Sequence, residues 1–86
     1  MADTVGLLRL GRAGVGLFET TLTEHSRAVG KAVSELQLPA GSMVAAVLRA
    51  GEPSVPGGSF TLAAGDEIIV ISDSATEADI RKSFQH

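Results

Sequence analysis

Arg49 is the side chain whose type and position in this sequence most directly favour binding chemistry. It ends the apolar segment 43–48 and is followed by the turn-forming dipeptide Ala-Gly. A guanidinium at a strand end can bind a phosphate through two parallel hydrogen bonds. The competing interpretation is a solvated arginine at the end of a strand, and the sequence alone leaves both interpretations open.

Four further residues could shape an apolar groove beside Arg49. Val47, Leu48 and Val55 could form the apolar walls of such a groove, and Pro56 could set its edge. The alternative for the three apolar side chains is ordinary core packing, and for Pro56 it is a residue that stops an edge strand from pairing further. Because successive strand residues point to opposite faces, core packing must hold for at least one of them.

The remaining polar residues do not predict a catalytic or metal site. His25 and His86 lie far apart in the chain, and there is no cysteine to join either of them in a metal-binding cluster. Asp66, Glu67 and Asp73 fall in turn-like segments without an adjacent base, so they are not predicted to act as general acids or bases. No serine has a motivated histidine and aspartate partner. We therefore predict no enzymatic activity, no metal and no cofactor.

The composition describes one small acidic domain with an aliphatic core. Of its 86 residues 44% are hydrophobic, which is ordinary for a folded domain, but the only aromatic residues are three phenylalanines. A chain this short gains stability from oligomerisation. The net charge of −3, without Trp or Tyr, argues against nucleic-acid binding.

Targeting and membrane signals are not found in the sequence. No apolar run approaches the roughly 20 residues of a membrane span, and no basic segment followed by an apolar one marks a signal peptide. The lack of cysteine fits a reducing cytoplasm. We expect a cytoplasmic protein that reaches a membrane only through a partner.

Alternating polar and apolar residues predict several strands. The segment Val15–Thr23 alternates with period two, as expected of a half-buried strand. The continuous apolar runs in Met43–Arg49 and Ile68–Ile71 predict strands buried on both faces, or with one face in the core and the other against a partner. Glu52–Pro56 suits an edge strand because of its prolines, and Val5–Leu10 predicts a less regular first strand.

Two short helices are predicted between and after these strands. In positions 26–36 the apolar residues Val29, Val33 and Leu36 recur at helical spacing. The second helix is predicted to begin at Ser74-Ala-Thr-Glu77, which matches a capping box and precedes apolar residues at i and i+4. The first helix would depend on docking against the sheet because it is too short to be stable alone.

This ordered set of segments resembles the TrkA-C (RCK-C) domain, the C-terminal regulatory module of proteins that regulate potassium conductance. The matching segments are the opening strand 18–22, the helix 29–36, the strand and turn 45–51, the dipeptide Val55-Pro56, and the loop and strand 61–70. The resemblance implies an α+β domain of β-α-β-β-β-α order, with a mostly antiparallel sheet, two short helices and a dimeric state. We assign residues 15–86 to this domain and residues 1–14 to an N-terminal strand or lead-in segment.

The resemblance also implies a function. The resemblance implies a regulatory domain that senses a ligand, dimerises and controls a cation transporter or channel, for potassium or for sodium and protons. Cyclic di-AMP, a nucleotide second messenger, is the implied ligand. In this interpretation it binds at the dimer interface against Val47, Leu48, Arg49, Val55 and Pro56. Replacing Arg49 by alanine would then weaken binding and leave the fold intact.

The implied partners are a second copy of the chain and a membrane transporter or channel. Binding to that transporter or channel would place the protein peripherally at the inner membrane. The alternative is a ligand-free structural dimerisation module of a transporter-regulating protein. The nucleotide-binding domain that usually precedes the family's module is not in this sequence. We expect either a fragment of a longer protein or a free-standing module.

Overall fold

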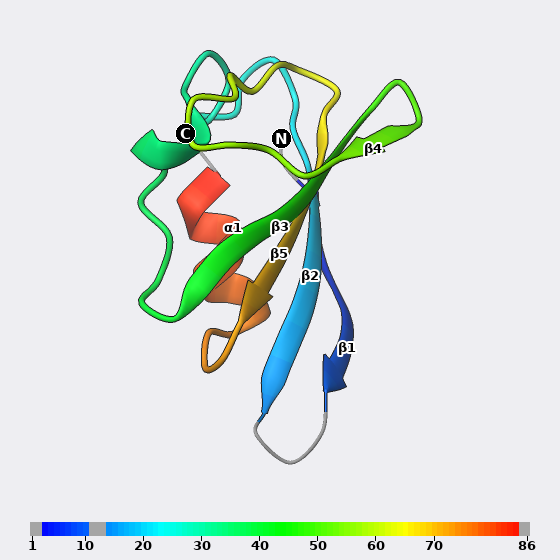
Figure 1. Ribbon diagram of the computed structural model, residues 1–86. Coiled ribbons are helices and arrows are strands. Elements are labelled where there is room, and N and C mark those ends of the chain that lie inside the picture. Colours follow the sequence, from blue (N-terminus) through cyan, green and yellow to red (C-terminus); the bar gives the residue numbers. More distant parts are fainter. Residues whose placement is uncertain (1–2, 11–13, 85–86) are drawn as a thin grey trace.

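The computed structural model describes residues 3–10 and 14–84, which form one sheet with a helix against it (Figure 1). The elements in chain order are β1 (Asp3–Leu10), β2 (Val15–Thr21), the 3₁₀ turn η1 (Val33–Glu35), β3 (Ser42–Arg49), β4 (Glu52–Ser54), β5 (Glu67–Ser72) and α1 (Glu77–Phe84). The predicted α+β class is confirmed. The predicted lead-in strand, β1, pairs with β2 and is part of the same sheet.

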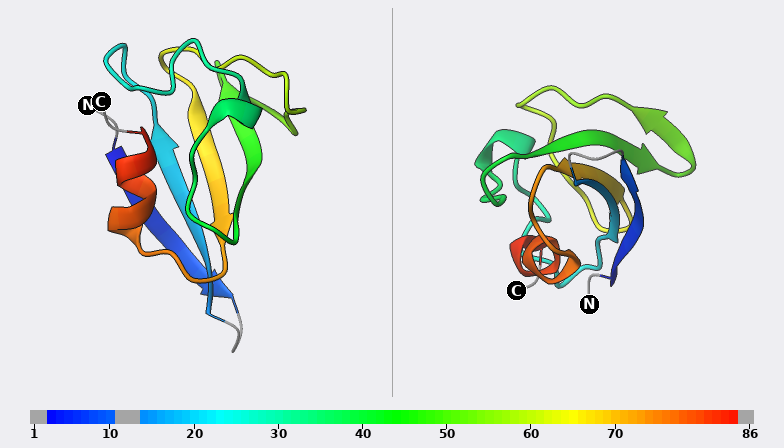
Figure 2. Two further views of the ribbon diagram at one scale, coloured as in Figure 1. Left: turned by 90° about the vertical axis from the view of Figure 1, so that its left-hand side faces the viewer. Right: turned by 90° about the horizontal axis from the view of Figure 1, so that it is seen from below.

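The five strands lie in the order β1-β2-β5-β3-β4, and every neighbouring pair is antiparallel. The short strand β4 lies at one edge, as its proline predicts. The sheet curls around α1, and its opposite, convex face carries no helix in the described part of the chain (Figure 2). The fold therefore has one helix-covered face and one uncovered face.

The core fills the concave side of the sheet, where α1 packs against β1 and β2. Burial alternates along β2 and β5, so Phe18 and Val70 point into the core while their neighbours point away from it. The helix contributes Ile80 and Phe84, both fully buried. The period-two pattern predicted for β2 is confirmed.

An irregularity in β3 decides which of its residues reach the core. The register shifts between Val44 and Ala46, so one extra residue bulges out of the ladder. As a result Val44 packs against the core and Val47 is fully buried in it, although an odd number of positions, three, separates them along the strand. Met43 is 60% exposed on the convex face. The sequence left open whether β3 is buried on both faces or has only one face in the core. In the structure only one face of β3 packs in the core.

The prediction of a helix over positions 26–36 is wrong. The structure forms turns there, followed by the 3₁₀ turn η1. Gly30 has φ of +85°, which is outside the right-handed helical region. Within the segment the backbone forms only isolated turn bonds, such as that from Lys31 N–H to the Ala28 carbonyl. Other groups bond to a distant loop: Gly30 N–H donates to the Leu62 carbonyl, and Val33 N–H donates to that of Phe60. These long-range bonds replace the helical ladder.

The last helix exists as predicted, but its cap lies two residues later. Thr76 is the capping residue, because its Oγ1 accepts from Asp79 N–H at 3.2 Å while Asp79 Oδ2 accepts from Thr76 N–H at 2.9 Å. Glu77, predicted to close the box with Ser74, instead accepts from Gly6 N–H of β1 and from Arg81. The helix is thus fastened to the sheet by the residue that was expected to cap it.

A tight two-residue turn joins β3 to β4. Arg49 pairs with Glu52 across it, and both central residues have positive φ, 52° at Ala50 and 80° at Gly51. Positive φ at both positions defines a type I′ turn, which favours Asn-Gly because alanine is strained in the left-handed region.

Replacing Ala50 by asparagine should raise the free energy of unfolding by about 1 kcal/mol, because asparagine tolerates positive φ better than alanine. Urea denaturation measures this change. Ala64→Asn is the matched control, since Ala64 is exposed but is not in the left-handed region. An equal gain in both variants would contradict the strain explanation.

Candidate ligand site at the β3–β4 hairpin

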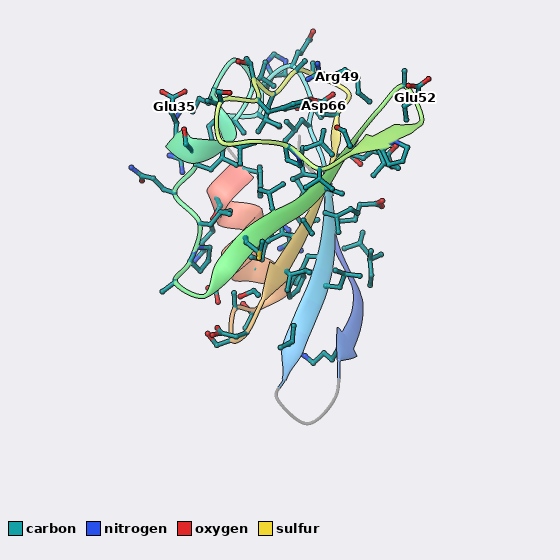
Figure 3. The ribbon with its side chains drawn as sticks, in the orientation of Figure 1. Glu35, Arg49, Glu52 and Asp66 are labelled. Atoms are coloured by element: carbon teal, nitrogen blue, oxygen red, sulfur yellow. The ribbon has the colours of Figure 1, made fainter. Side chains whose placement is uncertain are left out.

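The ion pair between Arg49 and Asp66 organises the region predicted to bind a ligand. Arg49 Nε donates to Asp66 Oδ1 at 2.8 Å, and Nη2 donates to Oδ2 at 2.7 Å. Nη2 also donates to the Thr61 carbonyl at 2.9 Å. Figure 3 shows the two side chains together where β3 ends, with Glu52 farther out toward the hairpin tip. This two-pronged pairing is the strongest geometry available to an arginine and a carboxylate.

The two partners differ greatly in exposure. The Asp66 side chain is 1% exposed and that of Arg49 is 49% exposed. The pKa of Asp66 is lowered, chiefly by its hydrogen bond from Arg49 and also by one from Ala63 N–H, although burial opposes this. The same hydrogen bond raises the pKa of Arg49. Both groups are therefore charged at neutral pH, and neither is poised to transfer protons.

A shallow depression adjoins the guanidinium. Its volume is about 230 Å³, and it is lined by Arg49, Glu52, Pro53, Ser54 and Phe60. The Arg49 Cζ atom lies 4.8 Å from the centre of the Phe60 ring, within range of a cation–π contact. The depression thus offers one positive group held between a carboxylate and an aromatic ring.

The other residues predicted for the site lie in different surroundings. Val47 is fully buried in the core, and Leu48 pairs with Glu67 and Pro53 on the convex side of the sheet. Val55 is 85% exposed and Pro56 is half-buried, and neither lines the depression. Within one chain, Arg49 is therefore the single predicted site residue that faces the depression.

Two residues of this region were not predicted from the sequence. Asp66 was interpreted as a turn carboxylate, and Phe60 was not assigned to a ligand site. The signal in the sequence that could have revealed the ion pair was an arginine at the end of one strand together with an aspartate directly before another. Asp66 does form a turn, since its Oδ2 accepts from Ala63 N–H at 2.9 Å, but it also holds Arg49.

The ion pair with Asp66 argues against the expectation that Arg49→Ala leaves the fold intact. The alanine variant would leave Asp66, a buried carboxylate, without its charged partner. Removing one member of such a pair is strongly unfavourable. Tests of binding at this site therefore need substitutions at exposed positions.

The convex face of the sheet is a second surface relevant to function. Cross-strand pairing places Leu17, Ile71 and Met43 in one row across β2, β5 and β3. Ile69 and Leu48 lie on the same side, as does Val5, which is 51% exposed. All six side chains are exposed or half-buried in the single chain. Glu19 and Glu67 lie on the same side, so the face is largely but not wholly apolar. Its row of apolar side chains is typical of an interface.

Residues 3–10 and 14–84 contain no group of three or more histidine, cysteine, aspartate or glutamate side chains placed to hold a metal. Among the helices in these same ranges, none has the length and apolar character needed to cross a membrane.

These features define a small α+β domain with a fully charged pair beside a shallow depression and an uncovered apolar sheet face. The chain belongs to the TrkA-C domain family, whose model matches residues 17–85. The predicted family is confirmed.

Curated relatives agree with this family. The chain is 30% identical over 69 residues to Trk system potassium uptake protein TrkA homolog 1 of Methanosarcina mazei, with 80% of this chain and 15% of that protein covered. It is 36% identical over 58 residues to the Trk system potassium uptake protein TrkA homolog of Archaeoglobus fulgidus, with 67% of this chain and 13% of that protein covered. The chain thus spans a small part of the length of these relatives.

Proposed function

We propose that this chain is a regulatory domain in the control of potassium uptake and that it acts as a homodimer without catalysing a reaction. The family supports this proposal, because the similar proteins from two archaea are Trk potassium uptake proteins. In this role the domain works in the cytoplasm and reaches the membrane through a transporter or channel that it regulates.

The observation that carries the dimer is the apolar convex face. It runs across β1, β2, β5 and β3, and no described helix covers it. A small aliphatic core gains from burying this surface against a second copy. A two-fold interface presents the same patch from both chains, and the apolar row of Leu17, Ile71 and Met43 could form such a patch.

Cyclic di-AMP is the ligand we propose for the hairpin depression. The volume of about 230 Å³ is below the roughly 300 Å³ typical of the smallest small-molecule sites, which favours a site shared between two chains. A second chain would complete it and could bring Leu48, Val55 and Pro56 against the ligand. Arg49 Nη1 makes none of the hydrogen bonds described above and is the guanidinium group left for a phosphate.

The test is calorimetric titration of the chain with cyclic di-AMP, with AMP, ATP and cyclic di-GMP as controls. Saturable binding of one ligand per two chains is expected. Val55→Asp should weaken it at least about tenfold by placing an anion near the phosphates, because tenfold corresponds to only about 1.4 kcal/mol. Ala78→Asp, on the exposed side of α1, is the matched control and should bind normally.

A ligand-free dimerisation module is the second candidate function, and the same convex face favours it. In that case the titration gives no heat with any nucleotide while the protein remains folded and dimeric. Binding by both Val55→Asp and the control with unchanged affinity would remove Val55 from the site. Binding at one ligand per chain would overturn the shared-site proposal.

A further inference from the structure

A second depression lies at the other side of the molecule, where the 26–37 segment passes over the end of α1 (Figure 1). Its volume is about 220 Å³, and its lining residues are Arg27, Ala28, Lys31, Leu36, Gln37 and Ser83. Two of these side chains are cationic and none is anionic. It shares no lining residue with the hairpin depression.

Arg27 is held in place by the last turn of the helix. Its backbone N–H donates to the Phe84 carbonyl and its Nη1 donates to the Lys82 carbonyl, both at 3.3 Å. Carbonyl groups at a helix C-terminus carry partial negative charge and attract a cation. One hydrogen bond occupies only one of the five guanidinium N–H groups, so the others are left for a ligand.

Lys31 stands on a backbone that is fixed at both ends. Its N–H donates to the Ala28 carbonyl at 3.1 Å, and its own carbonyl accepts from Leu62 N–H at 2.9 Å. Ala28 beneath it is fully buried. The lysine therefore extends from a rigid turn, and only its flexible side chain must be ordered when it binds.

The charges around this depression are unbalanced although the chain as a whole is acidic. Among the described residues, no salt bridge joins Arg27 or Lys31 to a carboxylate. Glu35, near them on η1, has its Oε1 bonded to Ala32 N–H at 2.7 Å, and Figure 3 places it well apart from Arg49 and Asp66. Lys82 is not counted, because it lies near enough to Asp79 to help lower that carboxyl's pKa.

We propose that this depression binds a phosphate group, as a phosphomonoester. An arginine offers a planar fork and a lysine a point charge, which is a common combination for phosphate. The Gln37 amide and the Ser83 hydroxyl add neutral hydrogen-bonding groups to the lining. The volume suits a headgroup and not a complete drug-sized ligand. This site goes beyond the proposed function, because it needs neither the dimer nor cyclic di-AMP.

The phosphate could come from a soluble metabolite or from a lipid headgroup, so the test has two arms. In the first, the ¹⁵N-labelled chain is titrated with glycerol 3-phosphate and followed by NMR. Saturable shifts confined to the amides of residues 27–37 and 82–84 are expected. In the second arm, vesicles of phosphatidylcholine with and without phosphatidic acid are tested for co-sedimentation.

Arg27→Gln and Lys31→Gln should each weaken binding about tenfold or more, because each removes a charge-assisted hydrogen bond to the phosphate. Arg9→Gln is the matched control, because Arg9 is also exposed and also donates to a backbone carbonyl, that of Gly14. Both pocket variants should keep normal cyclic di-AMP binding.

Binding in the soluble arm would assign a metabolite, and binding only to phosphatidic acid vesicles, dependent on Arg27 and Lys31, would assign a lipid. The proposal is overturned if neither probe binds, or if Arg9→Gln weakens binding as much as the pocket variants do. A negative result at this depression would leave the cyclic di-AMP result unaffected. A negative cyclic di-AMP titration would likewise leave the phosphate result unaffected.

Discussion

Asp66→Asn should lower the free energy of unfolding by about 2–3 kcal/mol, a large share of the stability of a domain this small. The aspartate is 1% exposed and accepts two hydrogen bonds from Arg49 and one from Ala63 N–H. Asparagine has nearly the same shape but no charge, so it weakens the two charge-assisted bonds. Urea denaturation at neutral pH measures the loss.

Glu52→Gln provides the matched control. Glu52 is exposed and pairs with Arg49 across the hairpin turn, so its substitution removes one negative charge near the same arginine. We expect little change in stability from this variant. An equal loss in both variants would mean that general charge balance around Arg49, and not the buried bond, stabilises the hairpin.

The pH dependence of stability should differ between the wild type and Asp66→Asn. Because folding lowers the pKa of Asp66, the pair contributes fully above the ordinary carboxyl pKa of about 3.9 and loses its contribution as pH falls from there through the folded value. The wild type should therefore lose stability below about pH 4 more steeply than the asparagine variant. Parallel acid curves for the two proteins would contradict this assignment.

The strands were predictable because their pattern depends directly on the two faces of a sheet. Alternation along β2 places Phe18 and Thr20 in the core, and the structure buries both. The apolar run of β5 likewise predicts a central strand, which it is. The bulge in β3 could not be predicted. Because the strand is apolar at nearly every position, its sequence is compatible with either register.

The segment 26–36 shows why helical spacing alone can mislead. Val29, Val33 and Leu36 all pack against the core, so the apolar positions were correctly identified. What the spacing could not reveal is that Gly30 takes positive φ and that the backbone bonds to the loop at residues 60–62. Those partners are distant in the sequence, and long-range bonds override weak local preference.

The candidate site was predictable only in part, for the same reason. A strand-end arginine is visible in the sequence, but its partner is seventeen residues away and is reached across the fold. Val47 and Leu48 separated to opposite faces as strand geometry requires. In the proposed dimer, the position of the second chain would decide which of them meets the ligand, and the sequence of one chain does not give that position.

Ile71→Glu should convert the proposed dimer into a monomer. Ile71 lies between Leu17 and Met43 in the apolar row of the convex face, so the substitution would bury a glutamate from each chain in the desolvated interface. Loss of apolar contact and burial of an unpaired charge together should weaken dimerisation at least about a hundredfold, or about 2.8 kcal/mol. Sedimentation equilibrium measures the association, and circular dichroism checks that the fold persists.

Ala78→Glu adds the same charge on the exposed side of α1 and should leave the dimer unchanged. Because Ile71 is half-buried on the face away from the core, its replacement should also leave the helix and the concave packing in place. A wild type that stays monomeric, or an Ile71→Glu variant that dimerises as tightly as the wild type, would show that the convex face is not the dimer interface. The apolar row across β2, β5 and β3 would then have to be covered by a different partner, and the transporter would be the next one to test.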